Sequence, residues 1–188
     1  NYLLVLHEGL SAWASNPITV VGRGRQFAVP DGLTPVGANL GNVVTLVGYR
    51  LDGVTWSDSW DETSRPSSTP PYAVAKPGQT VDVVLAWQAQ RWIPKNYTVF
   101  VHLLDASNTV RAQQDQVPLF DYSTLFWVPG EIVVDLYHLT LPADASPGAY
   151  QLELGMYERL DNTRLPVLGA NGARDTRVLL PPLLVPER

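Results

Sequence analysis

Apolar and polar side chains alternate along several stretches of this chain, and a period of two residues is typical of β-strands buried on one face. Thr80–Arg91 shows the alternation most clearly, and Ala149–Glu158 repeats it. Val43–Leu51 is apolar on both faces for part of its length, which predicts a central strand. The residues expected to share a face in these strands are Val81, Val83, Leu85, Trp87 and Ala89; Tyr150, Leu152, Leu154 and Met156; and Val43, Thr45, Val47, Tyr49 and Leu51.

Further strands complete the pattern. Asn96–Asp105 and Glu131–Leu141 are rich in β-branched and aromatic residues, whereas Thr109–Val117 is more polar and is expected at a sheet edge. Turn signals separate these strands, and the 16 prolines and 14 glycines fit helices poorly; the best helix candidate, His7–Ala14, is short and interrupted by a glycine. Shorter candidates at 18–21, 26–29, 164–168 and 176–185 bring the total to about eight to ten strands. The sequence predicts an all-β, two-sheet antiparallel sandwich, immunoglobulin-like or jelly-roll-like.

The length of 188 residues fits one domain. We divide the chain into an N-terminal segment of undetermined role, residues 1–25, and a single sandwich domain, residues 26–188, with a long loop at 52–79. The chain begins at Asn1, carries no signal-peptide pattern, and has no run near the ~20 apolar residues that a spanning helix needs. We expect a processed or excised segment whose anchor was removed or lies upstream.

Composition limits the classes of function. The net charge is −5 and the pI about 5.1, so the chain lacks the positive field that gathers nucleic acid, and we expect no such partner. The arginines are scattered, and we interpret them as solvated side chains. The absence of cysteine excludes disulfides and thiolate metal sites, and we expect no cofactor.

No catalytic motif stands out. There is no G-x-S-x-G elbow near any of the three histidines, so we expect this segment not to be an enzyme. His102 and His138 lie in predicted strands and could share a metal ion with Asp135 or Asp115, although the spacing is no known metal signature. We favour hydrogen-bonded packing roles for both histidines.

The loop at 52–79 is the first place to look for a site, because loops of this length are usually functional or disordered. Trp56 and Trp60 lie in polar sequence, where exposed rings could hold the flat faces of sugars, with Asp58 and Asp61 beside them. The alternative is that the rings plug one end of the sandwich. Asp58, Asp61 and Glu62 could also bind Ca²⁺, but the usual ladder of ligands is absent and a solvated acidic loop is favoured. Two other tryptophans, Trp87 and Trp127, look structural.

From Phe27 to about Val185 the chain resembles the C-terminal extracytoplasmic β-sandwich domain of bacterial membrane glycosyltransferases of the dolichyl-phosphate-mannose protein mannosyltransferase type, a domain that also occurs in related proteins of unknown function. The matching pieces, specific in their order, are Ala38–Leu51, Lys76–Ala89, Tyr97–Asp105, Gln114–Pro118, Trp127–Leu141, Ser146–Tyr157 and Arg164–Val167. The positions that match best are Asp115, Trp127, Pro129, Gly130 and Asp135, for which turn-making and strand-end hydrogen bonds are the expected use.

The resemblance implies an accessory role, because transferase chemistry in such proteins belongs to the membrane part. We therefore expect a non-catalytic domain at the outer face of the cytoplasmic membrane, attached to or associated with a membrane glycosyltransferase. Its expected partners are a carbohydrate or glycosylated acceptor and an upstream membrane domain or partner protein. The alternative is a structural or protein-interaction module of the cell surface with no small ligand.

Overall fold

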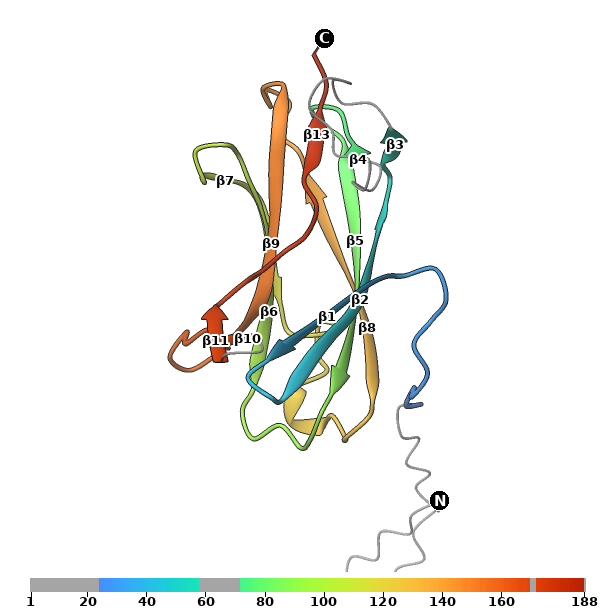
Figure 1. The fold of residues 1–188 in the computed structure, drawn as a ribbon, viewed down its shortest axis with the longest axis vertical. Helices are drawn as coiled ribbons and strands as arrows, with labels where there is room; N and C mark the ends of the chain where they lie inside the picture. The colour runs from blue at the N-terminus through green and yellow to red at the C-terminus, as the bar shows by residue number, and fades with distance from the viewer. Residues whose placement is uncertain (1–23, 58–71, 170–171, 188) are drawn as a thin grey trace, which may run out of the picture.

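The computed structural model describes residues 24–57, 72–169 and 172–187, and these form two β-sheets packed face to face (Figure 1). The predicted two-sheet sandwich is confirmed. Within the described ranges, no helix has the length and apolar content needed to cross a membrane.

The first sheet contains the longest antiparallel pairings of the fold. Its strands lie in the order β11-β10-β1-β2-β5-β8. Their bounds are β1 Thr34–Leu40, β2 Val44–Asp52, β5 Thr80–Ala89, β8 Ile132–Thr140, β10 Val167–Gly169 and β11 Gly172–Asp175.

The second sheet lies in the order β3-β4-β13-β9-β6-β7, and β12 pairs with β9 beside this path. Its pairings are antiparallel except for that between β4 and β13, which is parallel. The bounds are β3 Thr55–Ser57, β4 Tyr72–Val74, β6 Tyr97–Leu104, β7 Val110–Gln116, β9 Gly148–Glu158, β12 Val178–Leu179 and β13 Leu183–Val185; one 3-10 helix, η1, spans Thr124–Phe126 between β7 and β8.

The core lies between the sheets and contains the faces that alternation predicts for β5 and β9. Trp87 and Trp127 are fully buried, which confirms their structural role. The five inward residues of β5 are at most 1% exposed, so burial of this face excludes water along the whole strand and stabilises the sandwich.

The predicted face of β2 is wrong in part. Val44 and Leu46 face the core, as do Tyr49 and Leu51, so the inward residues change parity along the strand. A β-bulge between Leu46 and Gly48 causes the change, because one extra residue shifts every later side chain to the opposite face. The predicted central position of β2 is confirmed, since it pairs with β1 and β5.

Several short segments also differ from expectation. Residues 34–40 form β1, which the sequence did not indicate because its Pro35 and Gly37 resemble a turn and the pairing is irregular there. Within the predicted 26–29 strand only Gln26 makes an isolated bridge, and the long loop at 52–79 contains β3 and β4. The predicted 176–185 strand divides into β12 and β13, and the 164–168 strand is reduced to β10. The candidates at His7–Ala14 and 18–21 lie outside the described residues.

The outer edge of β8 is covered by side chains of β7 and, at Ile132, by the backbone of Gln26. Gln114 on β7 accepts from the backbone N–H of His138, and Gln116 donates to the carbonyl of Leu136. Gln116 also donates to Asp135, which is 2% exposed and accepts from the Tyr137 hydroxyl. These contacts cap an edge that would otherwise be open to pairing with another chain.

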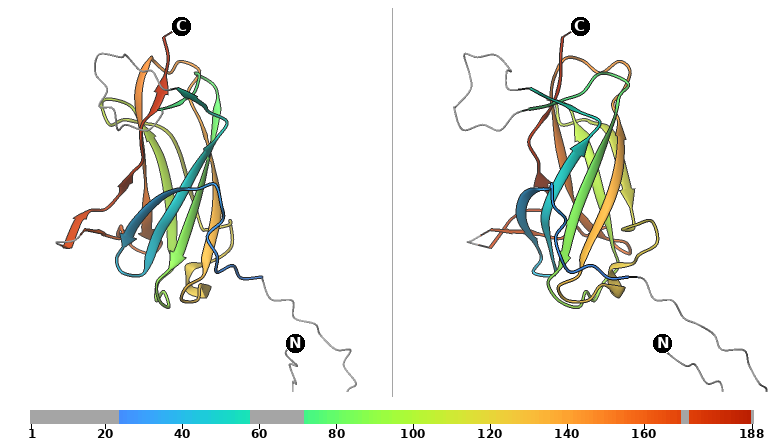
Figure 2. Two further views of the ribbon diagram at one scale, coloured as in Figure 1. Left: turned by 45° about the vertical axis from the view of Figure 1, so that its right-hand side comes forward. Right: turned by 90° about the vertical axis from the view of Figure 1, so that its right-hand side faces the viewer.

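The chain after β9 returns along the other edge of that strand. Arg164 bridges Tyr157, β12 pairs with β9, and β13 completes the run (Figure 2). Between them, the β10–β11 hairpin leaves the second sheet and pairs with β1 of the first. This segment therefore joins the two sheets along one side of the sandwich.

Candidate functional site

A connected set of polar side chains lies on the outer face of β6, β7 and β9, centred on His102. The ring Nδ1 of His102 lies 3.0 Å from Glu153 Oε1 on β9, and its Nε2 lies 3.0 Å from Asp115 Oδ1 on β7. Both ring nitrogens of His102 therefore face a carboxylate oxygen. His102 thereby ties three neighbouring strands together.

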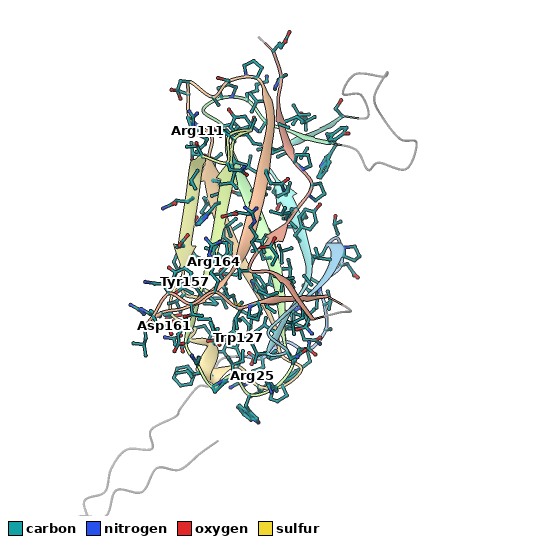
Figure 3. All side chains as sticks on the ribbon, turned by 60° about the vertical axis from the view of Figure 1, so that its left-hand side comes forward. Arg25, Arg111, Trp127, Tyr157, Asp161 and Arg164 are labelled. Atoms are coloured by element: carbon teal, nitrogen blue, oxygen red, sulfur yellow. The ribbon has the colours of Figure 1, made fainter. Side chains whose placement is uncertain are left out.

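Glu153 receives two arginines from the segment that returns beside β9. Arg177 donates from Nη1 to Glu153 Oε2 at 2.6 Å, and Arg164 Nη2 lies 3.9 Å from Oε1. The guanidinium of Arg164 also sits over the ring of Phe100, 4.1 Å from its centroid. Figure 3 shows Arg164 and Tyr157 on this side of the molecule. The arginines therefore fasten the returning segment to the sheet.

The solvent-facing side of the set is formed by Asp115 and Tyr157. The Asp115 side chain is 31% exposed and faces His102, and burial together with the nearby charge of Asp115 raises the pKa of the Tyr157 hydroxyl. The Tyr157 ring stacks beside Phe100, with centroids 6.4 Å apart. Asp115 thus keeps acceptor capacity toward solvent while its position is fixed from behind.

The charge of Glu153 is set by competing influences. Burial opposes its ionisation, but hydrogen bonds from Arg177 and His102, together with the charges of Arg177 and Arg164, outweigh burial, so the pKa of Glu153 lies below its ordinary value. Glu153 is therefore ionised at neutral pH, and its carboxylate holds Arg177 and Arg164 in place.

These groups form a polar surface that can bind a ligand. Donors and acceptors on three rigid strands are preorganised for a polar ligand, because their rotamers are fixed by ion pairs and by packing. Among residues 24–57, 72–169 and 172–187, no three His, Asp or Glu side chains gather closely enough to hold a metal ion.

The disfavoured alternative, in which His102 and His138 share a metal ion, does not fit the fold. His102 lies on β6 in the second sheet, whereas His138 lies on β8 in the first and faces Asp82 Oδ1 at 2.6 Å. Both histidines make the hydrogen-bonded contacts that the sequence favoured. They form two separate cross-strand His–carboxylate pairs, one on each outer face.

The structure describes only part of the loop at 52–79 that carries Trp56 and Trp60. Trp56 lies on β3 and is 52% exposed. Its partner in the register is Ala73, which is buried in the core, so the Trp56 side chain starts on the inner face of the sheet. Trp60, Asp58 and Asp61 lie outside the described residues, so their roles stay predictions.

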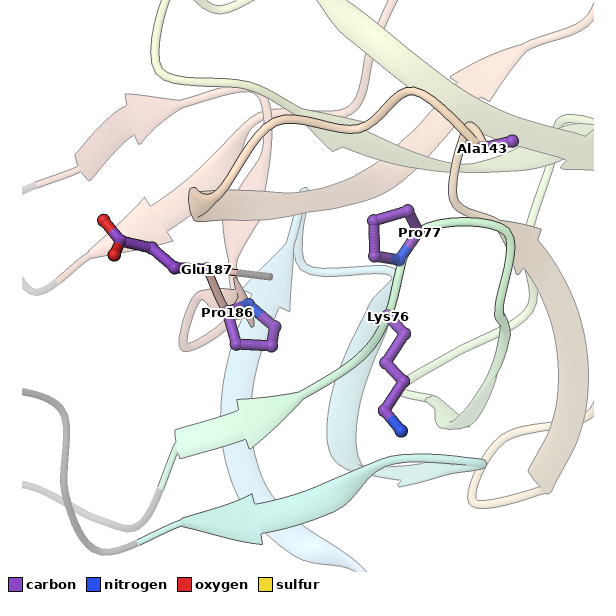
Figure 4. A pocket seen from close by; sticks show the side chains of 5 residues that line it. All are labelled: Lys76, Pro77, Ala143, Pro186 and Glu187. Atoms are coloured by element: carbon purple, nitrogen blue, oxygen red, sulfur yellow. The ribbon is translucent and has the colours of Figure 1, made fainter.

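A shallow hollow of about 310 Å³ lies near the C-terminal end of the chain (Figure 4). It is lined by Lys76, Pro77, Ala143, Pro186 and Glu187, and all but Pro77 are exposed. Ligand pockets usually combine buried apolar walls with a few convergent polar groups. This hollow lacks such walls, so we do not assign it a ligand.

The interpretation of the arginines as solvated side chains is incomplete, because several of them form ion pairs. Arg164 and Arg177 converge on Glu153, and Arg25 pairs with the buried Glu131 near Tyr122. Arg164 and Arg177 lie 11 and 24 residues after Glu153, so no local pattern could have joined them. Only the pairing of the returning segment with β9 brings them to the carboxylate.

Comparison with known proteins yields no assignment. No family model matches the chain, and no curated protein matches it. Among solved structures, the chain is similar to the crystal structure of the C-terminal domain of Wzt, with a TM-score of 0.48 and 12% identity over 85% of this chain and 81% of that one. A similarity at this level assigns neither a site nor a function.

Proposed function

We propose that this chain is a non-catalytic carbohydrate-binding domain whose ligand lies on the outer face of β6, β7 and β9. The observation that carries the proposal is the hydrogen-bonded chain from Asp115 through His102 to Glu153, with Tyr157 beside it. Sugars offer closely spaced hydroxyl groups that both donate and accept, and a fixed row of such partners matches them.

Preorganisation supports binding rather than packing alone. A ligand that meets side chains already held in position loses less conformational entropy on binding. Asp115 and Tyr157 are held from behind by His102 and Phe100, yet Asp115 remains exposed to solvent. Gln113, opposite His102 in the register, is also exposed and adds an amide to the same face. The proposed ligand contacts are Asp115, Gln113 and Tyr157.

Trp56 remains a proposed second contact. It lies on β3, at the opposite edge of the sheet from β7, and its side chain starts on the inner face, so only an extended glycan that passes around that edge would reach both places. Its half-exposed ring offers an apolar face for a sugar. Trp60, Asp58 and Asp61 are proposed beside it on the sequence alone.

The proposed setting follows from the family resemblance. In this setting, the domain is an accessory to a membrane glycosyltransferase. It lies at the outer face of the cytoplasmic membrane and binds a glycan or a glycosylated acceptor. Reading the full-length gene product tests this setting: many apolar spans upstream would support it, and a lone signal peptide would instead favour a free surface module.

A glycan array followed by calorimetry tests the binding activity. We expect a hit among bacterial surface glycans, an affinity in the micromolar range or weaker, and loss of heat on Asp115→Ala. Trp56→Ala tests the second proposed contact. If the site reaches β3, this variant should lower the affinity for extended glycans and leave the affinity for short ones unchanged. Absence of any glycan hit, together with a defined protein complex in crosslinked membranes, would favour the interaction-module alternative.

A further inference from the structure

One end of the sandwich presents an unusual number of exposed apolar side chains. Several of the eleven large apolar residues that are exposed in the described ranges belong to the segments at this end, Phe120 among them. We call five of the others the loop-end patch: Phe27, Trp92, Leu125, Phe126 and Leu160. Trp92 is 64% exposed, Phe126 62% and Leu160 91%.

The segments that carry the patch are joined to one another by hydrogen bonds. Asn96 in the β5–β6 loop accepts from the backbone of Arg159 in the β9–β10 turn and from the Ser123 hydroxyl beside η1. Thr124 donates to the carbonyl of Lys95. Arg25, near the start of the described chain, donates to the carbonyl of Phe126. The patch is therefore one fixed surface built from four segments.

We propose that the loop-end patch rests on a lipid bilayer, with its apolar tips at the level of the headgroups. The patch consists of separate exposed side chains, or tips, on several loops, and each can insert into the headgroup region of a bilayer independently of the others. Aromatic and leucine side chains partition favourably there. Two of the tips directly follow exposed arginines in the sequence, Arg91 before Trp92 and Arg159 before Leu160.

The position of the preceding chain supports this occupant. The described residues start at Gly24 at this end, opposite the end from which the C-terminal residues leave (Figure 2). Residues 1–23 must therefore join the sandwich beside the patch.

Charge contributes little to the proposed contact. Four cations lie in these segments, Arg25, Arg91, Lys95 and Arg159, against four carboxylates, Asp121, Glu131, Glu158 and Asp161. Apolar contact must therefore supply most of the affinity, and binding should depend only weakly on salt and on anionic lipid. The inference rests on the proposed membrane location but not on the proposed glycan binding.

Vesicle co-sedimentation of the full 188-residue chain tests the inference. The probes are phosphatidylcholine vesicles with and without phosphatidylglycerol. The test variant replaces Trp92, Phe126 and Leu160 by alanine, and the matched control replaces Val110, Leu136 and Leu179, which are exposed apolar residues on strands elsewhere. Thermal melting establishes that each variant is folded.

We expect the wild-type chain to bind both kinds of vesicle, the loop variant to lose at least about tenfold in partitioning, and the control to stay within about twofold of wild type. Wild-type protein that stays in the supernatant, or a loop variant that binds as well as wild type, would overturn the inference. Light scattering that finds a dimer abolished by the loop variant, without vesicle binding, would overturn it in favour of a second copy of the chain.

Discussion

Gly155 on β9 lies directly beneath the ring of Phe100 on β6: a Cβ added at Gly155 would stand 2.7 Å from Phe100 Cζ. The carbonyl of Thr176, in the returning segment, would lie 3.2 Å from the same point. The absence of a side chain at Gly155 therefore lets Phe100 and the returning segment pack close to the sheet. This packing sets the position of Arg164 over Phe100 and of Arg177 beside Glu153.

Replacement of Gly155 by alanine is expected to lower the free energy of unfolding by about 1 to 3 kcal/mol, because the methyl group overlaps a buried ring. Chemical denaturation measures the change. Gly24→Ala is the matched control, since nothing lies within 4 Å of its added Cβ and it should change stability by less than about 0.5 kcal/mol. Equal effects of the two substitutions would show that the close approach at Gly155 is not built into the fold.

Glu153→Gln is expected to remove a pH-dependent contribution to stability. The folded-state pKa of Glu153 is depressed, so its contribution is present above the unfolded pKa, about 4.3, and is lost as pH falls through the folded value. The variant should be less stable than wild type near pH 7, by about 1 to 3 kcal/mol, and this deficit should shrink in acid. Urea unfolding at several pH values checks this, and a deficit that is constant with pH would contradict it.

Asp135→Asn is expected to have the opposite pH signature. Burial raises the pKa of Asp135 despite hydrogen bonds from Tyr137, Gln116 and the backbone. A raised folded-state pKa means that the contribution to stability is complete below the unfolded pKa, about 3.9, and is lost as pH rises through the folded value. The asparagine cannot ionise, so the stability of the variant relative to wild type should rise with pH. A relative stability that falls over that window would refute the assignment.

Strand patterns predicted most of the scaffold and little of the site. Alternation identified β5 and β9 because each long strand keeps one face in the core without interruption. It failed in β2, where one bulged residue reverses the faces, and in β1, whose proline and glycine suggest a turn. The site could not be predicted, because Arg164 and Arg177 reach Glu153 only through long-range pairing.

Phe120 presents a further test of backbone geometry. Leu119 and Phe120 both have positive φ, +52° and +68°, a region that costs non-glycine residues about 1 kcal/mol or more each. The Phe120 ring is 72% exposed, so little burial would be lost on its removal. Phe120→Asn should therefore raise the unfolding free energy by about 0.5 to 1 kcal/mol, as asparagine tolerates this region. Leu125→Asn, in η1, should give no gain, and a gain there equal to that at Phe120 would speak against backbone relief.

The His–carboxylate pair on the proposed glycan-binding face has a counterpart on the other outer face of the sandwich. His102 and Asp115 form a cross-strand pair on the outer face of the second sheet, and His138 and Asp82 form one on the outer face of the first. Asp115→Asn and Asp82→Asn thus remove one carboxylate charge each from comparable surroundings.

Calorimetric titration of both variants with the best glycan from the array measures the central claim. We expect Asp82→Asn to bind within about twofold of wild type and Asp115→Asn to bind at least about tenfold more weakly, which corresponds to about 1.4 kcal/mol. Equal affinity of Asp115→Asn and wild type, or a loss confined to Asp82→Asn, would contradict the assignment of the ligand to the face of β6, β7 and β9.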